Sequence, residues 1–194
     1  MTETSVRILA VSDAPWADVE RIFGTRGDPS TCWCQFFKVP PSDWKTKKPL
    51  EFKEMLQEQV LTRQPPPAVV AYLDDEPVGW CAIEPRDHYP RVLNSQVGSA
   101  SDQPTGDPAI WAVTCFVVRV GFRRKGVGRA LLEGAVRQAR ESGARVIEGY
   151  PIDPVEKKFS SADLYHGTLS QFLGAGFEVV SRPSPNRALV QLAL

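Results

Sequence analysis

The sequence predicts an α/β protein with a single mixed sheet of about seven strands, flanked by about four helices. Two observations support this fold class. Apolar runs of strand length alternate with segments of helical period, in the order βααββ, a long loop, then βαβαββ. The 194 residues show no internal repeat and no linker, and this length suits one domain over residues 1–194.

The N-terminal region predicts a short strand followed by a helix. The strand is VRILAVS, beginning at Val6. The helix follows with Asp13 as its cap, because apolar side chains then recur at helical spacing. These side chains are Trp16, Val19, Ile22 and Phe23. The apolar connector TCWCQFF that comes next has no clear assignment.

A second helix and a hairpin are predicted next. The helix covers residues 49–64 and ends at three consecutive prolines. Its inward side chains are expected to be Leu50, Met55, Leu56 and Val60. The hairpin consists of strands Ala68–Leu73 and Val78–Glu84 around a turn at residues 74–77.

The second half of the chain alternates strands and helices after a long polar segment. Residues 86–108 lack periodicity, and loops of this length are usually functional or mobile. Residues 109–120 are apolar on both faces, which predicts a central strand. Helices are then predicted over 126–143, ended by Gly143, and over 160–176, ended by Gly176, with strands over 144–150, 177–182 and 187–194.

Charge and composition exclude several classes of function. Basic and acidic residues number 23 each, so the chain lacks the basic excess of a nucleic-acid or membrane-surface protein. No apolar run reaches the roughly 18 to 20 residues that span a bilayer. The N-terminus has no signal pattern, so we expect a cytoplasmic protein with its four cysteines reduced.

The segment FRRKGVGRA, residues 122–130, predicts an anion site. It places four cations and two glycines between the central strand and the next helix. Glycine at a helix start exposes backbone N–H groups at the positive end of the helix dipole, and phosphate is their natural partner.

Two known phosphate-binding patterns fit this segment poorly. A nucleotide P-loop is excluded, because Val127 and Gly128 stand where lysine and a hydroxyl residue are required. A dinucleotide fingerprint fits at Gly126 and Gly128, but Leu131 fills its third glycine position. An NAD(P)-dependent oxidoreductase therefore remains as a weaker alternative.

The third pattern, R-x-x-G-x-G, runs from Arg123 to Gly128 and carries a family resemblance. It resembles the coenzyme A pyrophosphate loop of the GCN5-related N-acetyltransferases (GNAT). The preceding run from Val118 to Arg123 also matches the family, except that Val120 replaces the usual proline. The element order extends the resemblance over nearly the whole chain, and a C-W-C segment with a GYP-x-DP segment resembles uncharacterised bacterial members. The resemblance implies the GNAT fold, a twisted and mostly antiparallel mixed sheet.

The resemblance implies where acetyl-CoA would lie. The backbone of Phe116, Val117 and Val118 would pair with its pantetheine arm, and the N–H of Phe116 would polarise the thioester carbonyl. The pyrophosphate would be held by the loop, which consists of Arg123, Arg124, Lys125, Gly126, Val127, Gly128 and Arg129. No metal is expected.

Two proton transfers require side chains if acetyl moves to an amine. We expect Glu84, at the end of the strand GWCAIE, to act as the base, with Glu148 and Asp153 in reserve. A solvent-facing structural carboxylate is the competing interpretation of Glu84.

The acid is harder to identify in the sequence. Family members often carry a tyrosine where this chain has Phe172, which cannot donate a proton. Tyr165 is the best substitute, followed by His166 or a water molecule, although its ring could equally serve packing.

The remaining aromatic and cysteine residues are candidates for packing or for an acceptor pocket. Cys115 is expected to be an inert buried thiol rather than a nucleophile. Cys32 and Cys34 lack a second close pair of ligands for a metal. Packing of these two cysteines near an acceptor pocket is the better interpretation. The candidate residues lining that pocket are Trp33, Phe36 and Trp80.

The sequence thus predicts a cytoplasmic N-acetyltransferase that moves acetyl from acetyl-CoA to an amine by direct attack in a ternary complex. A small-molecule acceptor is preferred, because no long acidic stretch exists to attract a lysine-rich tail. A module that binds coenzyme A without turnover is the alternative from another class. Because family members often dimerise, the resemblance also allows a homodimer.

Overall fold

The computed structural model describes residues 6–154, 159 and 163–194. Its strands are β1 Val6–Ala10, β2 Ala68–Leu73, β3 Glu76–Pro85, β4 Ile110–Val118, β5 Val146–Gly149, β6 Glu178–Ser184 and β7 Arg187–Ala193. Its helices are α1 Trp16–Phe23, α2 Asp28–Cys32, α3 Pro41–Thr46, α4 Pro49–Thr62, α5 Pro90–Leu93, α6 Val127–Glu141 and α7 Leu169–Leu173. Short 3-10 turns are η1 Val11–Asp13, η2 Arg86–His88, η3 Gly98–Ala100 and η4 Asp163–His166.

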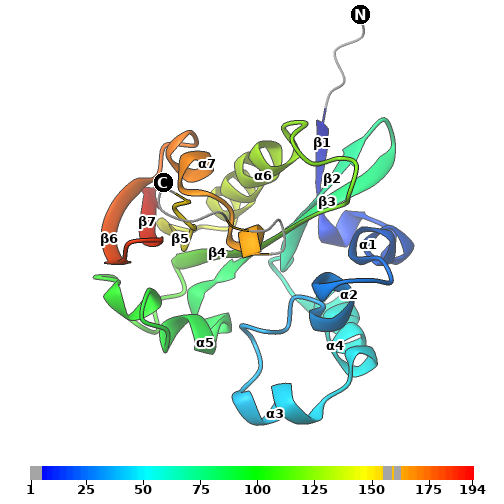
Figure 1. Ribbon diagram of the computed structural model, residues 1–194, viewed down its shortest axis with the longest axis horizontal. Helices are drawn as coiled ribbons and strands as arrows, with labels where there is room; N and C mark the ends of the chain where they lie inside the picture. The colour runs from blue at the N-terminus through cyan, green and yellow to red at the C-terminus, as the bar shows by residue number, and fades with distance from the viewer. Residues whose placement is uncertain (1–5, 155–158, 160–162) are drawn as a thin grey trace, which may run out of the picture.

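The seven strands form one sheet in the order β1-β2-β3-β4-β5-β7-β6 (Figure 1). All neighbouring strands are antiparallel except β4 and β5. The predicted mixed, mostly antiparallel sheet is therefore confirmed. The parallel pairing covers β4 only from Ile110 to Val113, whereas the pairing of β4 with β3 extends to Val118. From Thr114 onward, one edge of β4 has no partner among the described strands.

A bulge at Thr114 marks the point where β4 leaves β5. Val113 and Cys115 lie opposite consecutive residues of β3, so Thr114 is an extra residue in the ladder. One inserted residue reverses which face each later side chain occupies. Val113 before the bulge and Phe116 after it consequently face one core, while Cys115 faces the other.

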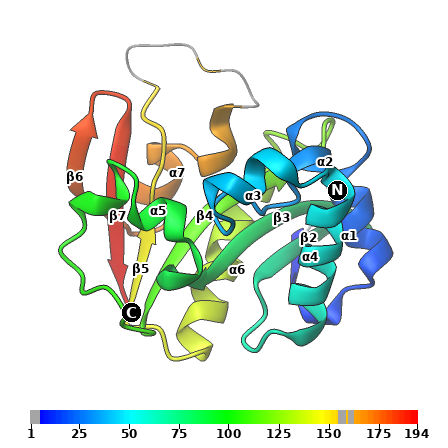
Figure 2. The same cartoon turned by 90° about the horizontal axis from the view of Figure 1, so that it is seen from below.

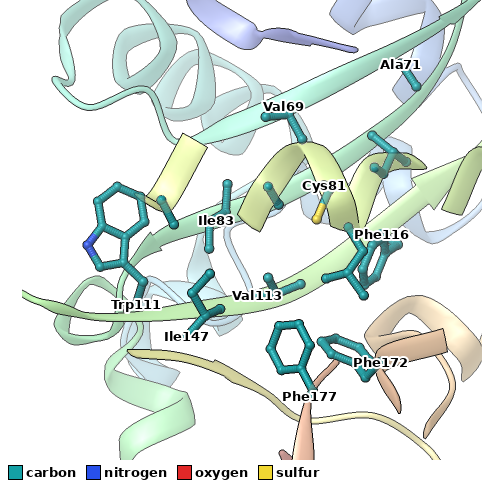
Figure 3. Close-up of a cluster of buried hydrophobic side chains, with 14 of the residues drawn as sticks. Val69, Ala71, Cys81, Ile83, Trp111, Val113, Phe116, Ile147, Phe172 and Phe177 are labelled. Carbon is teal, nitrogen blue, oxygen red and sulfur yellow. The ribbon is translucent and has the colours of Figure 1, made fainter. Parts of the chain in front are cut away.

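Two apolar cores lie on opposite faces of the sheet. Figure 2 shows α6 behind the sheet and α2, α3 and α4 in front of it. The core under α6 and α7, seen in Figure 3, includes Val69, Cys81, Ile83, Trp111, Ile147, Phe172 and Phe177. The core under α1 and α4 includes Val19, Phe23, Trp33, Cys34, Leu56, Trp80 and Cys115. Within the described ranges, no helix is long and apolar enough to cross a membrane.

The predicted single helix over residues 160–176 is wrong for the described part of that range. The structure has η4, then Gly167 with φ +76°, then α7. The Ile152 N–H donates to the Gly167 carbonyl (3.0 Å), and the Leu169 N–H donates to the Ile152 carbonyl (2.9 Å). Tertiary pairing therefore uses backbone groups that a continuous helix would need for itself. The first residues of the range, 160–162, lie outside the described residues.

Other predictions need smaller corrections. The first helix begins at Trp16 with Pro15 as its N-cap, and Asp13 lies in η1 instead. In α4, Leu50 is 63% exposed, and Phe52 takes the inward position. The segment 86–108 contains three short helical turns, η2, α5 and η3, which are too brief to produce a periodic pattern.

Candidate active site

The loop between β4 and α6 presents free backbone N–H groups. Gly126 is the N-cap of α6 with φ +78°, and Arg124 also has a positive φ of 61°. The first hydrogen bond of the helix runs from the Ala130 N–H to the Gly126 carbonyl (3.0 Å). The amides of residues 127–129 therefore lack a helical acceptor and lie at the positive end of a 15-residue helix.

The four cations of this loop flank those amides in the sequence and are exposed. Arg123 donates from Nε to the Val118 carbonyl (3.1 Å), which holds it at the end of β4. Arg129 pairs with Glu133 (2.8 Å), an exposed contact one helical turn away. Among the residues that the structure describes, no carboxylate pairs with Arg123, Arg124 or Lys125. Their charge is free to meet a ligand.

The loop has room for a pyrophosphate against its backbone. A Cβ built on Gly126 would meet no atom within 4 Å, and one built on Gly128 would lie 3.4 Å from Gln171 Nε2. Gln171 also donates from Nε2 to the Gly128 carbonyl (2.8 Å), which fixes the loop against α7. Open space, free donors and unpaired cations fit the diphosphate of coenzyme A.

The unpaired edge of β4 leads from the bulge to this loop. Phe116 is 8% exposed, and its ring packs edge to face with that of Phe172, with the ring centroids 6.1 Å apart. Its side chain is therefore part of the core. Val117 is also buried, and Val118 is partly buried. Only their backbone groups are therefore available to a ligand, as the sequence predicts, and this role remains a prediction.

Glu84 lies near the end of β3, where Lys38, Arg63 and His88 contact its carboxylate. Its side chain is 1% exposed and pairs with Lys38, Arg63 and His88, whose Nδ1 lies 3.0 Å from Oε1. Burial alone would raise the pKa of Glu84, but Lys38, His88 and Arg63 outweigh burial and lower this pKa to about 2. Glu84 is therefore neither solvent-facing nor a strong base by itself.

This cluster of four side chains reaches toward the bulge in β4. Tyr89, which exposes none of its surface, interacts with both Glu84 and Thr114. Burial, followed by the negative charge of Glu84, raises the pKa of Tyr89 well above its ordinary value. Neither Lys38 nor Arg63 is signalled by the sequence. His88 stands four residues after Glu84, but that spacing suggests contact only in a helix, and here it spans a strand end and η2.

The two reserve carboxylates are engaged elsewhere. Glu148 is fully buried and accepts hydrogen bonds from Arg86 (3.0 Å) and the Tyr150 hydroxyl (2.8 Å). Asp153 pairs with Arg182 (2.7 Å). Both carboxylates thus have arginine partners, and neither joins the Glu84 cluster.

Tyr165 lies on η4, which packs against β4. It is 38% exposed. The centroid of its ring lies 4.3 Å from the ring centroid of His166 and 6.3 Å from that of Phe37. Its hydroxyl lies within electrostatic range of Cys115, and burial raises the pKa of Tyr165, which keeps it protonated near neutral pH. Phe172, at the position where the family has its tyrosine, is fully buried.

His166 is a poor second candidate for the acid. It is 6% exposed, and burial followed by the charge of Arg187 lowers the pKa of His166 to about 3. It is consequently neutral at physiological pH.

The thiols gather where the connector after α2 meets β4. The Trp80 indole N–H donates to Cys34 Sγ (3.2 Å), and the Cys34 and Cys115 side chains interact by a hydrogen bond. This bond lowers the pKa of Cys34 against the effect of its burial, and it raises the pKa of Cys115 well above the ordinary value. Within the described ranges, no group of three or more His, Cys, Asp or Glu side chains is placed to hold a metal ion.

Of the three residues expected to line the acceptor site, two are buried in the core and one is half-buried. The prediction for Trp80 is not supported, because its side chain exposes none of its surface. Trp33 is 6% exposed and stacks on Phe23 at 4.9 Å, so it also belongs mainly to the core. Phe36 is half-buried beneath the Arg91 guanidinium, at 4.5 Å, and can still contact a ligand.

Comparison with known proteins gives the same family as the resemblance. The sequence model of the Acetyltransferase (GNAT) family matches residues 31–153. No curated protein matches this chain.

Solved structures share the fold at low sequence identity. A GCN5-related N-acetyltransferase from Kribbella flavida is 15% identical, with a TM-score of 0.51, over 97% of this chain and 98% of its own. An acetyltransferase of the GNAT family from Streptococcus pneumoniae is 16% identical, with a TM-score of 0.52, over 99% of both chains. The yncA protein from Salmonella typhimurium, solved with its cofactor acetyl-CoA, is 15% identical, with a TM-score of 0.54, over 98% of this chain and 94% of its own.

Proposed function

Because the chain belongs to the GNAT family of acetyltransferases, which use acetyl-CoA as cosubstrate, we propose that it acetylates a small-molecule amine by direct attack in a ternary complex. The observation that carries this proposal is the loop at residues 123–129, directly after the open edge of β4, with its free amides and with three cations that no described carboxylate pairs. The alternative of an NAD(P)-dependent oxidoreductase is not retained.

The loop and the β4 edge divide the work of binding. The amides of residues 124–129 hold the pyrophosphate, and the exposed cations neutralise its charge. The backbone of Phe116 to Val118 receives the pantetheine arm. The N–H of Phe116, just beyond the bulge, donates to the thioester carbonyl and stabilises the negative charge that develops on this oxygen.

The transfer forms a C–N bond and breaks the C–S bond of the thioester. The amine nitrogen loses one proton, and the departing thiolate gains one. We assign Glu84 to receive the amine proton, directly or through water. With a pKa of about 2, Glu84 cannot keep the proton near neutral pH and passes it on to water.

Tyr165 is assigned to protonate the leaving thiolate. It stays protonated near neutral pH, and it approaches β4 at Cys115, next to the assigned oxyanion donor. Direct attack by the amine is favoured over a covalent acyl-enzyme, because the Cys115 thiol on β4 has a raised pKa and is a weak nucleophile.

A binding titration tests the first step of this function. The protein is titrated with acetyl-CoA, CoA, NADH and NADPH while its unfolding midpoint is followed. At a hundredfold excess over Kd, a ligand adds about 2.7 kcal/mol to the free energy of unfolding. We expect acetyl-CoA and CoA to raise the midpoint and the nicotinamide nucleotides to leave it unchanged. Failure of both CoA species to bind would refute the proposed function.

Turnover is measured next by thiol release with a panel of small amines and a lysine-rich peptide. We expect acetylated small amines, identified by mass. Acetylation of the peptide alone would reject the small-molecule acceptor, and binding without release of thiol would favour a CoA-binding module.

A further inference from the structure

Arg187, the first residue of β7, is a half-buried cation with no carboxylate partner in the described part of the chain. Two other arginines nearby, one buried and one exposed, are paired. Arg86 pairs with Glu148 (3.0 Å), and Arg182 pairs with Asp153 (2.7 Å), so the neighbouring carboxylates are already engaged. Removing a cation from water without a counter-ion is costly, and the missing anion therefore needs an explanation.

Two side chains that interact with Arg187, His166 and Tyr165, are neutral near neutral pH. His166 is uncharged near neutral pH, since its pKa is about 3. Tyr165 stays protonated and also interacts electrostatically with Arg187. The Phe37 ring, 5.3 Å from the His166 ring, covers the same cluster from the connector after α2. None of these three side chains balances the guanidinium charge.

Arg187 is connected by backbone bridges to the segment that packs against β4. Its backbone bridges Ile152, just beyond the end of β5, and Ile152 bridges Thr168 after η4. Tyr165, on η4, interacts electrostatically with both Arg187 and Cys115 on β4. The loop at residues 123–129, called the CoA loop below, comes after Val118, at the far end of the same strand. The unpaired arginine is thus separated from the pyrophosphate site by the segment of β4 assigned to the thioester.

We propose that Arg187 binds an oxyanion of the acceptor, so that the acceptor is an amine carrying a carboxylate, such as an amino acid. This inference rests on the proposed acetyl transfer and names the substrate class for it. A guanidinium matches a carboxylate with two parallel hydrogen bonds, and half-burial among aromatic rings strengthens them. Tyr165 then lies between the anion of the acceptor and the thioester. Its ring and hydroxyl help to orient the amine.

The experiment compares acceptors that differ only in their anion. For methionine and for phenylalanine, the probes are the amino acid, its carboxamide and the corresponding amine without the carboxylate. The pair β-alanine and 2-aminoethylphosphonate distinguishes a carboxylate from a phosphorus oxyanion. Initial rates are measured by thiol release at saturating acetyl-CoA, and binding to the CoA complex is measured by calorimetry.

We expect at least one amino acid to exceed its amide and its simple amine by about tenfold or more in kcat/KM, since hydrogen bonds between charged groups contribute about 1.5 to 3 kcal/mol. Arg187→Gln should remove this preference mainly through a higher KM for the amino acid, and Arg187→Lys should restore part of it. Arg182→Gln, which removes an exposed cation in the neighbouring strand, is the matched control and should keep the preference. Unfolding midpoints verify that each variant is folded.

Several results would overturn the inference. These are equal or better kinetics with the amide or amine, no binding of any amino acid to the CoA complex, a preference for the phosphonate over the carboxylate, or an Arg187→Gln variant that keeps the preference. If CoA binds and neutral amines are acetylated, only the anion site is wrong. If no CoA species binds, the proposed acetyltransferase function itself fails.

Discussion

The CoA loop (residues 123–129) and the Glu84 cluster both gather cations, but they use them in opposite ways. In the loop, exposed cations stand beside free amides, and the described residues supply no carboxylate for Arg123, Arg124 or Lys125. Around Glu84, the cations converge on one buried carboxylate and are neutralised within the protein. The same charge therefore forms a ligand site in one region and an internal ion-pair network in the other.

The loop is local in sequence, whereas the cluster is assembled by the fold. Four cations and two glycines within nine consecutive residues are enough to predict an anion site. Lys38, Arg63 and Glu84 come from the connector after α2, the end of α4 and β3, respectively. This difference predicts that changes in the loop affect ligand binding, while changes in the cluster affect both stability and turnover.

The largest effect is expected from Gly128→Val. Its side chain would occupy the space over the loop amides where the pyrophosphate must approach, so acetyl-CoA affinity should fall on the order of a thousandfold, about 4 kcal/mol. The fold should persist, because a Cβ at this position lies no closer than 3.4 Å to Gln171. Calorimetric titration with acetyl-CoA measures the loss.

Gly128→Ala is the graded control for this prediction. Its single methyl group should weaken binding less than valine does, at an unchanged unfolding midpoint. Tight binding by Gly128→Val would show that the pyrophosphate does not approach the backbone here.

Glu84→Gln tests the cluster and is expected to lower kcat by about a hundredfold, the usual scale of general acid–base contributions. It should also reduce the free energy of unfolding by about 3 kcal/mol, because it leaves Lys38 without its buried counter-ion. Denaturation and thiol-release assays measure the two effects. Asp75→Asn breaks an exposed pair with Arg7 and should change neither. If stability falls while kcat holds, the cluster is structural only.

The pH dependence sharpens this test. The pKa of Glu84 is about 2 in the folded protein against an ordinary value of 4.5. The contribution of ionised Glu84 to the free energy of unfolding is therefore complete above pH 4.5 and is lost as the pH falls toward 2. The wild-type advantage in stability over Glu84→Gln should shrink across this window. An acidic limb of kcat near neutral pH would therefore belong to another group.

What the sequence could predict follows the same division. The central strand, α6 and the loop between them depend on contiguous patterns, and the fold they imply is confirmed. The bulge at Thr114 left no signal, because both faces of β4 are apolar and a change of face does not alter the pattern. The break at Gly167 was missed because it depends on pairing with Ile152. The unpaired state of Arg187 could not be inferred either, since it depends on where every neighbouring carboxylate finds its partner.

The smallest effect is expected from Tyr165→Phe. This variant tests whether Tyr165 is the general acid at the open edge of β4. If Tyr165 protonates the leaving thiolate, kcat should fall by about tenfold, since water can replace a lost proton donor in part. The alkaline limb should also disappear, and in the wild type it lies above pH 10 because burial raises the pKa of Tyr165 above 10.0. Tyr72→Phe is the matched control, because the Tyr72 hydroxyl donates to Asp18 (2.8 Å), away from the site. An unchanged rate and alkaline limb would leave Tyr165 as a packing residue beside Arg187 and would assign the proton to water. A lost limb would instead place the acid beside the thioester at the open edge of β4.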